Sequence, residues 1–539
     1  MTTTRTVTNE SGSAAVAESL LWTINDVSSI AGPVVINFSN AVTEIPISGN
    51  PSTTDRANTI SCNNLTINGQ RPDGVRVRIR NVNSQPNALA LFSVSGLFNN
   101  LKTAFHLENL EVYSDPSARP QVPCKLFDIK YVSKVSVRNC YLHDNAAGTA
   151  TASHKSGGAI NFVGCPDVSF NSSILNNNTA GGGGAITLGN SRARILKSEF
   201  VGNVSGSNGG AIQATGAVDI TDSVFRNNQA SSPSSGSGGG VYVAGAGVES
   251  RITGCVFEGN IAVSQGGGLH VGGNAPTVIT RSSFESNKAS MGGGVSAFSA
   301  SITIELSTFA ENTSTSSIAS PLKQGGGALY AYRTPITVTS SLFTGNRAVD
   351  GAGLAYFSDF PFESSLFNNT FYGNTASGTG GGLVIASVIR KVHMTNCTIA
   401  KNTAGTNGGG IWIASGSFIE VGNNLIALNS APTSGPDVYG AVMSYGTNLV
   451  GVANLTHGFI GSDITGTPTS PLDPEIGPLS NNGGFTLTSA LLPSSPAIDA
   501  GNPALIPLSN PLAAFDQRGQ SPFFRTSNGR PDVGAFELQ

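Results

Sequence analysis

Two histidines with charged neighbours are the side chains in this sequence best suited to acid–base chemistry. His143 is followed by Asp144, and His154 is followed by Lys155. An imidazole exchanges a proton near neutral pH, and a neighbouring carboxylate can orient it for that task. A catalytic site also needs a further orienting group, and the sequence shows none beside either pair. We therefore predict no catalytic residue, and keep these two pairs as the alternative.

Cleavage of an acidic polysaccharide requires two carboxylates, or carboxylates beside a lysine or arginine, within a few ångströms of one another. The C-terminal region contains such residue types: Asp499, Asp516, Arg518, Arg530, Asp532 and Glu537. We expect these groups to pair with one another and to seal the end of the fold, since a repeat structure needs polar ends. No Cys-x-x-Cys or Cys/His spacing indicates zinc, and we predict neither a metal nor a cofactor.

Aromatic side chains offer a different chemistry, which is binding. They recur, together with one histidine, at positions expected to face outward from successive strands: Tyr242, His270, Phe298, Tyr330, Tyr332, Phe357 and Trp412. Ring faces stack on sugars and pack against protein partners, and exposed apolar patches tend to mark binding sites. We predict that these residues bind a carbohydrate or a protein surface. In the alternative, loops or the C-terminal segment cover the rings, which are then ordinary core.

Two short marks repeat along the chain and must position these residues. The first is an aliphatic residue or Phe, two further residues and Asn, and it starts at Leu142, Ile174, Phe200, Phe225, Phe257, Phe284, Phe309, Phe343, Phe371, Ile399 and Ile426. The second is a glycine pair or triplet leading into an aliphatic residue: Ile160, Ile186, Ile212, Val241, Leu269, Val295, Leu329, Leu354, Leu383 and Ile411. Both series advance by 25 to 34 residues and alternate one for one. A period of this length is typical of a solenoid.

Each repeat also shows the alternation of strands with one buried face, and none shows a helical pattern. In one repeat Val218, Ile220 and Phe225 face the same way if the chain bends at 221–222. Three such strands fill a repeat, and only a stack of repeats can bury a continuous apolar face. We predict an all-β fold, a single-stranded right-handed parallel β-helix with three short strands per coil.

Two columns of small polar residues support this stacking. A small side chain lies two residues before the Phe of the first mark, as at Ser198, Ser223 and Cys255, and Asn lies three residues after it. Asn amides stacked from coil to coil can bond to one another at a bend. Glycines permit the positive φ that a sharp corner needs. We expect nearly all of the repeated residues to be structural.

The ends of the chain differ from the repeats. Apolar residues at helical spacing, including Leu20, Ile24 and Val27, predict a short helix that caps the first coil. After about residue 460 the repeat stops, and proline and charged residues become frequent. We predict three regions: 1–60 with the N-terminal cap and first strands, 61–460 with the β-helix repeats, and 461–539 with an irregular C-terminal cap.

Composition excludes several classes of function. The net charge of −3 provides no basic field for nucleic acid. No apolar run approaches the roughly 20 residues that cross a bilayer as a helix. The N-terminal residues show no apolar core of a signal peptide.

Six cysteines are present. Cys140, Cys255 and Cys397 share one column several coils apart, too far for a disulfide, and we interpret them as small buried residues. Disulfide formation stays open among the other three: Cys62, Cys124 and Cys165.

The two marks, seen as GGAI at 209–212 and FRNN at 225–228, resemble the repeats of chlamydial polymorphic outer membrane proteins. The stretches DPEIGPLSNNGG, SPAIDAG, DQRG and DVGAFE are similar to the C-terminal choice-of-anchor Q region of secreted bacterial β-helix proteins. The front end, with RTVTNESGS, SLLWTIND and GPVVINFS, is similar to the start of the same group. The resemblance implies a right-handed parallel β-helix at, or released from, a cell surface, with no common enzymatic activity.

This sequence departs from both groups after the repeats. Only two residues come after Glu537, so neither a sorting segment nor a membrane barrel is part of it, and retention on a cell stays open. We predict a non-enzymatic extracellular or cell-surface protein, adhesive or structural, with assembly into a homo-oligomer or filament as one form of that role. The alternative is a polysaccharide lyase or glycoside hydrolase of the pectate-lyase-like β-helix type with a loop-borne site.

Overall fold

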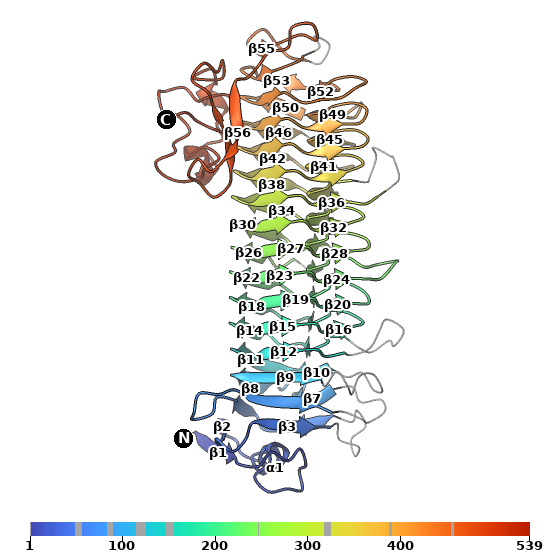
Figure 1. Cartoon of the computed structure of the whole chain (residues 1–539), viewed down its shortest axis with the longest axis vertical. Helices are drawn as coiled ribbons and strands as arrows, with labels where there is room; N and C mark the ends of the chain where they lie inside the picture. Colours follow the sequence, from blue (N-terminus) through green and yellow to red (C-terminus); the bar gives the residue numbers. More distant parts are fainter. Residues whose placement is uncertain are drawn as a thin grey trace. The chain divides into compact units, whose positions relative to one another are not determined.

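The structure is a computed structural model of the whole chain (Figure 1). It describes residues 2–48, 57–82, 90–114, 125–146, 156–245, 247–316, 325–387, 391–417, 419–453 and 458–539. The chain forms two compact units: Met1–Ser250 with Asn260–Ser264 is unit 1, and Arg251–Gly259 with Gln265–Gln539 is unit 2. The predicted region boundaries at 60 and 460 stay predictions.

Unit 1 winds into coils whose strands form parallel sheets, and each sheet is named by its place in the coil. The glycine-led sheet contains β4 (Asn58–Ile60), β7 (Ala90–Ser95), β10 (Lys125–Lys130), β13 (Ile160–Val163), β17 (Ile186–Gly189), β21 (Ile212–Ala214) and β25 (Val241–Val243). The middle sheet contains β1 (Thr3–Val7), β2 (Val34–Phe38), β5 (Asn64–Asn68), β8 (Lys102–Glu108), β11 (Val132–Arg138), β14 (Asp167–Asn171), β18 (Ala193–Leu196) and β22 (Val218–Thr221). The phenylalanine sheet contains β3 (Glu44–Ile47), β6 (Val77–Asn81), β9 (Leu110–Ser114), β12 (Tyr141–His143), β15 (Ile174–Asn176), β19 (Glu199–Val201) and β23 (Val224–Arg226). A fourth sheet has two-residue strands: β16 (Thr179–Ala180), β20 (Val204–Ser205), β24 (Gln229–Ala230) and β28 (Ile261–Ala262).

Unit 2 repeats the same four kinds of strand. Its glycine-led sheet contains β29 (Leu269–Val271), β33 (Val295–Phe298), β37 (Leu329–Tyr332), β41 (Leu354–Phe357), β45 (Leu383–Ala386), β49 (Ile411–Ile413) and β52 (Val438–Tyr439). Its middle sheet contains β30 (Thr277–Thr280), β34 (Ile302–Glu305), β38 (Ile336–Thr339), β42 (Ser364–Phe367), β46 (Val392–Thr395), β50 (Ile419–Gly422) and β53 (Met443–Ser444). Its phenylalanine sheet contains β27 (Val256–Glu258), β31 (Ser283–Glu285), β35 (Thr308–Ala310), β39 (Leu342–Thr344), β43 (Thr370–Tyr372), β47 (Thr398–Ala400), β51 (Leu425–Ala427), β54 (Leu449–Val450) and β55 (Ile464–Thr465). Its two-residue strands are β32 (Lys288–Ala289), β36 (Thr313–Ser314), β40 (Arg347–Ala348), β44 (Thr375–Ala376) and β48 (Thr403–Ala404), and β26 (Ser250–Thr253) lies at the division between the units.

The predicted all-β parallel fold is confirmed, and the coil is richer by one strand than predicted. Val218, Ile220 and Phe225 are buried, and the chain bends at Asp222, whose φ is +48°. The two-residue strands escaped prediction because two residues are too few to show alternation.

A ladder of buried asparagines joins successive coils within each unit. The Oδ1 atom of Asn203 accepts two hydrogen bonds of 3.0 Å, from the backbone N–H and the Nδ2 of Asn178. Its own Nδ2 donates to the carbonyl of Leu175 at 2.8 Å and to Oδ1 of Asn228 at 2.9 Å. The amide therefore satisfies its own donors and those of its neighbour without water. The ladder comprises Asn145, Asn178, Asn203, Asn228 and Asn260 in unit 1, and Asn287, Asn312, Asn346, Asn374, Asn402 and Asn429 in unit 2.

Asp437 ends this ladder in unit 2. Its Oδ1 accepts from the backbone N–H and the Nδ2 of Asn429, at 3.1 and 2.8 Å, and its Oδ2 accepts from the N–H of Val452 at 2.6 Å. Burial raises the pKa of Asp437 to about 6, in spite of these donors. A carboxylate is suited to the end of the ladder because both of its oxygens accept hydrogen bonds there.

The small-residue column forms a second ladder, as predicted. Ser198 donates its N–H to the hydroxyl of Ser223 at 3.1 Å, and Cys255 donates its N–H to the hydroxyl of Ser282 at the same distance. The phenylalanines of the first mark stack as predicted within each unit, with ring centroids 4.9 Å apart for Phe200 and Phe225. In unit 2 the stack runs through Phe257, Phe284, Phe309, Phe343 and Phe371 at 4.6 to 5.0 Å.

The predicted position of one mark is wrong. The sequence predicts it at Ile174, whereas Leu175 is the buried residue that pairs in register with Phe200, and Asn178 is the ladder residue. Ile174 is 36% exposed. Two aliphatic residues and three asparagines in succession fit the mark in either register, and only the stacking decides between them.

The N-terminal cap is a one-strand, one-helix arrangement in unit 1. The helix α1 (Leu20–Asp26) begins at Ser19, whose hydroxyl accepts from the N–H of Trp22. Its apolar side, Leu20 and Ile24, is buried, which confirms the predicted amphipathic helix. The strand β1 precedes the helix and pairs with β2.

The C-terminal segment of unit 2 lies against the sides of several coils (Figure 1, red). It contains the hairpin β56 (Ile476–Ser480) and β57 (Thr488–Leu491) and the short 3-10 helices η3 (Pro503–Leu505) and η4 (Pro511–Ala514). It is tied to the coils by hydrogen bonds from Asn368 to the carbonyl of Phe515, and from the N–H of Ala535 to Thr398.

The charged groups of the C-terminal segment are bound within it. Asp516 forms an ion pair of 2.6 Å with Arg518, and Glu537 pairs at 2.9 Å with the buried Arg525. Arg530 donates to the carbonyl of Gly501. The Oδ1 and Oδ2 atoms of Asp532 accept from the backbone N–H groups of Asp499 and Leu538. The expectation that these groups satisfy one another is confirmed for the Asp516–Arg518 pair, whereas Arg525 was not anticipated.

The ladder predicts a site-specific cost for removing one amide. Asn228→Ala leaves the backbone N–H and the Nδ2 of Asn203 without their acceptor in a buried place, which should cost about 2–5 kcal/mol of unfolding free energy. Chemical denaturation followed by circular dichroism measures this loss. The matched control is Gln229→Ala, the adjacent exposed amide. Equal stability of the two variants would contradict a stabilising role of the ladder.

Candidate functional site

The predicted aromatic residues of unit 2 occupy neighbouring strands of the glycine-led sheet. The register pairs Phe298 with Tyr332 and Tyr332 with Phe357. Phe298 is 37% exposed and Trp412 is half-buried, whereas Tyr330 is 3% exposed. The exposure of the other four predicted residues also varies. Tyr332, Phe357 and His270 are buried, and Tyr242 in unit 1 is half-buried.

Tyr330, Tyr332 and Phe357 form one buried cluster with the alanines and valine of the neighbouring strands. The Tyr330 and Phe357 rings lie 5.9 Å apart, and burial raises the pKa of Tyr330. This burial favours the alternative in which these rings are covered. Phe298 and Trp412 keep accessible surface, and a binding role for the seven residues stays a prediction.

His143 contacts a further orienting group, Glu111, in addition to its sequence neighbour Asp144. Its Nδ1 lies 2.7 Å from Asp144 Oδ2, and its Nε2 lies 3.4 Å from Glu111 Oε1 on the preceding coil. Its ring is stacked between Tyr141 at 4.0 Å and Tyr113 at 5.2 Å. Both ring nitrogens thus face carboxylates, which orient the imidazole, and a catalytic role of this pair stays the untested alternative. His154–Lys155 lies outside the described residues.

A further carboxylate occupies an outward position of the glycine-led sheet on β10, one coil before the first glycine mark at Ile160. Asp128 is 5% exposed and pairs in register with Asn161, whose Nδ2 donates to it at 2.7 Å. Lys130 lies 2.9 Å away and Lys125 lies 3.5 Å away. These cations hold the pKa of Asp128 below its usual value despite burial. The group is a compact ion cluster in unit 1.

The middle sheet of unit 2 carries the most varied set of ionisable groups. Glu420 on β50 is 4% exposed, and its carboxylate contacts Lys391, His393 Nδ1 at 2.7 Å and the hydroxyl of Tyr445 at 2.8 Å. The bound lysine and tyrosine outweigh burial and lower the pKa of Glu420. A hollow of about 310 Å³ lies between these strands and Ala504–Pro507 of the C-terminal segment.

The candidate binding site lies at a corner of unit 2, where the chain passes from the glycine-led sheet to the middle sheet. Ser299 and Arg333 directly follow β33 and β37, and each has a φ of +52°. Asn274 takes the same conformation one coil earlier, with a φ of +61°. This left-handed conformation turns the chain sharply, and a residue other than glycine rarely adopts it. Successive corners therefore stack three polar side chains in a column.

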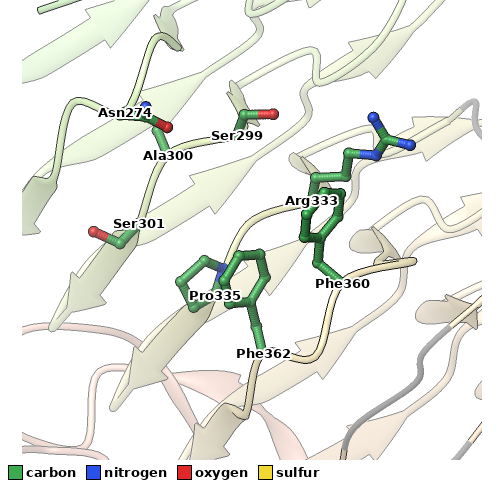
Figure 2. Close-up of a pocket in the computed structure, with 8 residues that line it drawn as sticks. All are labelled: Asn274, Ser299, Ala300, Ser301, Arg333, Pro335, Phe360 and Phe362. Atoms are coloured by element: carbon green, nitrogen blue, oxygen red, sulfur yellow. The ribbon is translucent and has the colours of Figure 1, made fainter. Parts of the chain in front are cut away.

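A hollow of about 410 Å³ opens beside this column (Figure 2). Its polar lining is Asn274, Ser299, Ser301 and Arg333, and its apolar lining is Ala300, Pro335, Phe360 and Phe362. The two phenylalanines come from the loop 358–363, which joins β41 to β42. Phe360 is 45% exposed, and its ring lies 5.9 Å from that of Phe362 at an angle of 13°.

Arg333 is held in one position by three neighbours. Its Nε and Nη2 donate to the two carboxylate oxygens of Asp359, both at 2.6 Å. The guanidinium lies 5.1 Å from the ring centroids of Tyr332 and of Phe360. Asp359 raises the pKa of Arg333, which keeps it charged. Among the residues that the structure describes, Nη1 binds no acceptor, so this amino group can donate to a ligand.

This arrangement suits binding better than acid–base catalysis. An exposed ring offers a flat apolar face, while an arginine, an asparagine and two serines offer donors and acceptors around it. Asp359, the one carboxylate that contacts the lining side chains in the described part of the chain, is already occupied by Arg333. The corner can therefore bind a ligand that presents an apolar C–H face and hydroxyl groups, such as a sugar ring.

Sequence reasoning did not find this corner. The column has no common residue type, and its members share only a conformation that the sequence does not show. The one available signal was the loop SDFPF at 358–362, which places two phenylalanines among turn residues.

The described part of the chain contains no group of three or more His, Cys, Asp or Glu side chains placed to hold a metal ion. Five cysteines of that part are free and buried: Cys62, Cys140, Cys165, Cys255 and Cys397. Cys124 lies outside it. In the same described ranges no helix is long and apolar enough to span a membrane.

A family model described as right handed beta helix region matches residues 203–371 and 239–457. Together with the parallel stacked strands, this match makes the chain a right-handed parallel β-helix. No curated protein matches the sequence.

Among solved structures, tailspike protein 3 of bacteriophage CBA120 matches with 13% identity, a TM-score of 0.38, and coverage of 87% of this chain and 64% of that one. This chain thus spans less than two thirds of the tailspike's length. Pectate lyase Pel9A matches with 13% identity and a TM-score of 0.28, covering 100% of this chain and 97% of its own. The catalytic unit of an alpha-1,3-glucanase from Streptomyces thermodiastaticus matches with 12% identity and a TM-score of 0.30, covering 87% and 71%.

The burial of the aromatic cluster predicts that its tyrosines contribute to stability. Tyr330→Ser removes a buried ring from a packed cluster and should lower the unfolding free energy by about 3–5 kcal/mol. Phe298→Ser, at an exposed ring of the same sheet, should cost much less. Denaturant titrations of both variants check this. A Tyr330 variant as stable as the unmodified chain would contradict the burial of this ring and support the prediction that it is an exposed binding residue.

Proposed function

We propose that this chain is a non-enzymatic, extracellular or cell-surface binding protein whose corner in unit 2 binds the sugar rings of a carbohydrate. We name this site the corner pocket of unit 2. It is the hollow lined by Asn274, Ser299, Ala300, Ser301, Arg333, Pro335, Phe360 and Phe362. Adhesion to a polysaccharide or a glycosylated surface is the role that such binding serves. Assembly into a homo-oligomer or filament is a further form of the same role.

One observation carries the proposal: an exposed phenylalanine ring lies against an arginine that is fixed in place. Phe360 is 45% exposed, so the face of its ring is accessible to a ligand. Arg333 is already oriented by Asp359 and by two rings, so binding loses little side-chain entropy. An apolar face beside preset donors is the usual composition of a small-ligand pocket.

The extracellular assignment is supported by the sequence resemblance to surface-displayed β-helix proteins and not by the pocket.

Substitution of the pocket rings tests the proposal. Phe360→Ala and Arg333→Ala should each weaken binding to the recognised polysaccharide by about tenfold, because one removes the stacking face and the other a fixed donor. Affinity electrophoresis in gels containing a neutral glucan, xylan or polygalacturonate measures this effect. Thermal denaturation should show both variants folded.

A matched control is available in the same unit. Phe485 is 43% exposed and lies 5.6 Å from the guanidinium of Arg281, the same pairing of an exposed ring with an arginine at another place. Phe485→Ala should leave binding unchanged. Failure of the unmodified chain to bind any of the three polymers, or equal loss in the Phe485 variant, would reject the corner as the binding site.

The second candidate function is cleavage of a polysaccharide, and the Glu420 hollow favours it. A buried carboxylate, an imidazole and a phenol meet beside a space of about 310 Å³, and these are groups that catalyse proton transfer. Against this, Lys391, His393 and Tyr445 already occupy both carboxylate oxygens.

We therefore expect no turnover by the purified chain. Incubation with neutral glucans, xylan and polygalacturonate should release neither reducing ends nor unsaturated products across the mildly acidic to mildly alkaline pH range. Activity in the unmodified chain that disappears in Glu420→Gln would establish the enzyme instead. A parallel Glu305→Gln variant, at an outward position of the same sheet, controls for the loss of charge.

A further inference from the structure

A second corner in the chain is built like the corner pocket of unit 2. In unit 1 a hollow of about 320 Å³ is lined by Phe98, Leu101, Tyr131, Val163, Gly164, Pro166 and Asn190. We name it the corner pocket of unit 1. It lies where the chain passes from the glycine-led sheet to the middle sheet, between β10 and β11, β13 and β14, and β17 and β18.

Its base is again a column of three left-handed corner residues. Tyr131, Gly164 and Asn190 directly follow β10, β13 and β17, with φ of +54°, +62° and +46°. The backbone fixes them, because the N–H of Tyr131 donates to the carbonyl of Val163, and that of Gly164 to Gly189, each at 2.9 Å. In unit 2 the N–H groups of the corner residues donate to the next coil in the same way, at 3.0 Å from Ser299 and 2.9 Å from Arg333.

Each pocket also has a proline and an aromatic ring in its lining, at different places in the column: the ring comes from the coil before the column in unit 1 and from the coil after it in unit 2. A proline stands two residues after a corner residue in both pockets: Pro166 after Gly164, and Pro335 after Arg333. An aromatic ring from a longer turn completes each pocket. In unit 1 this ring is Phe98, which is 78% exposed.

Phe98 contacts the corner residue Tyr131, as Phe360 contacts the corner residue Arg333. Its ring lies 5.9 Å from that of Tyr131 at 88°, an edge-to-face arrangement. A side chain at Gly164 would come within 2.8 Å of the Tyr131 ring, so the absence of one lets that ring lie flat over the corner. The polar residues of the lining are Tyr131 and Asn190, whose side chain is exposed.

From these correspondences, and on the basis of the proposed function, we infer that the corner pocket of unit 1 is a second carbohydrate site and that the natural ligand is a polymer of repeating sugar units. One chain then carries two sites for the same kind of ring. A repeating polymer presents the same sugar ring many times, so each of the two pockets finds a ligand on it. A ligand with one isolated sugar would gain nothing from the second pocket.

Stoichiometry separates this inference from the proposed function. Isothermal titration with cellohexaose, xylohexaose and a galacturonate hexamer should give two sites per chain for the bound oligosaccharide. Phe98→Ala and Phe360→Ala should each reduce the number to one, and the double variant should bind none. Retention on the corresponding insoluble polymer should fall by about tenfold or more in either single variant.

Leu97→Ala is the matched control, because Leu97 is 70% exposed in the same turn yet does not line the hollow. It should keep two sites. One site in the unmodified chain, abolished by Phe360→Ala and untouched by Phe98→Ala, overturns the second site and leaves the proposed function standing. No binding of any hexamer, or of the polymers, overturns both. An equal effect of Leu97→Ala and Phe98→Ala also overturns the assigned pocket.

Discussion

The hydrogen bond from one coil's asparagine to the next coil's asparagine is the interaction on which this structure depends. A strand of three residues forms too few contacts to determine its register with the strand of the next coil. Its apolar side chains alone would also pack in a shifted register. The buried amide removes that freedom, because Asn203 must face Asn178 on one side and Asn228 on the other to satisfy all of its polar atoms. In the coils that the ladder joins, register, ring stacking and the position of the corners depend on this constraint.

The surface of each unit is a consequence of the same constraint. Once the inner residues are in register, the outward residues of successive coils lie in columns at the spacing of strands in a sheet, about 4.8 Å. A ligand recognised by one corner therefore meets a column of side chains rather than a single residue. Asn274, Ser299 and Arg333 form such a column, and the neighbouring loop adds the Phe360 ring. The proposed binding site thus lies at a corner and its loop, where residue identity can vary without cost to the stack.

Much of the interior could be predicted from sequence. The asparagines and the phenylalanines recur as single residue types at a fixed place in each repeat, and the need to bury a continuous face determines what they do. One repeat is an exception. At Ile174 and Leu175 the sequence fits the mark in two registers, and only pairing with Phe200 selects the second.

The candidate site could not be predicted in the same way. Its corner residues share a positive φ and not a chemical type, so no pattern in the sequence marks them. The predicted aromatic column was correctly placed on neighbouring strands, yet alternation reports only the side of the sheet that a residue faces. Whether other parts of the chain bury Tyr330 depends on contacts far away in sequence. Glu111 was missed beside His143 for the same reason, since it lies one coil away.

Hydrogen exchange at the ladder tests the central claim most directly. The backbone N–H groups of Asn178, Asn203 and Asn312 are bonded to side chains and not to a strand's carbonyl groups. If the amide ladder holds the coils in register, these N–H groups exchange as slowly as those inside the adjoining strands. Exchange as fast as that of the exposed turn at Ser234 would show that the ladder is not formed in solution and does not hold the coils together.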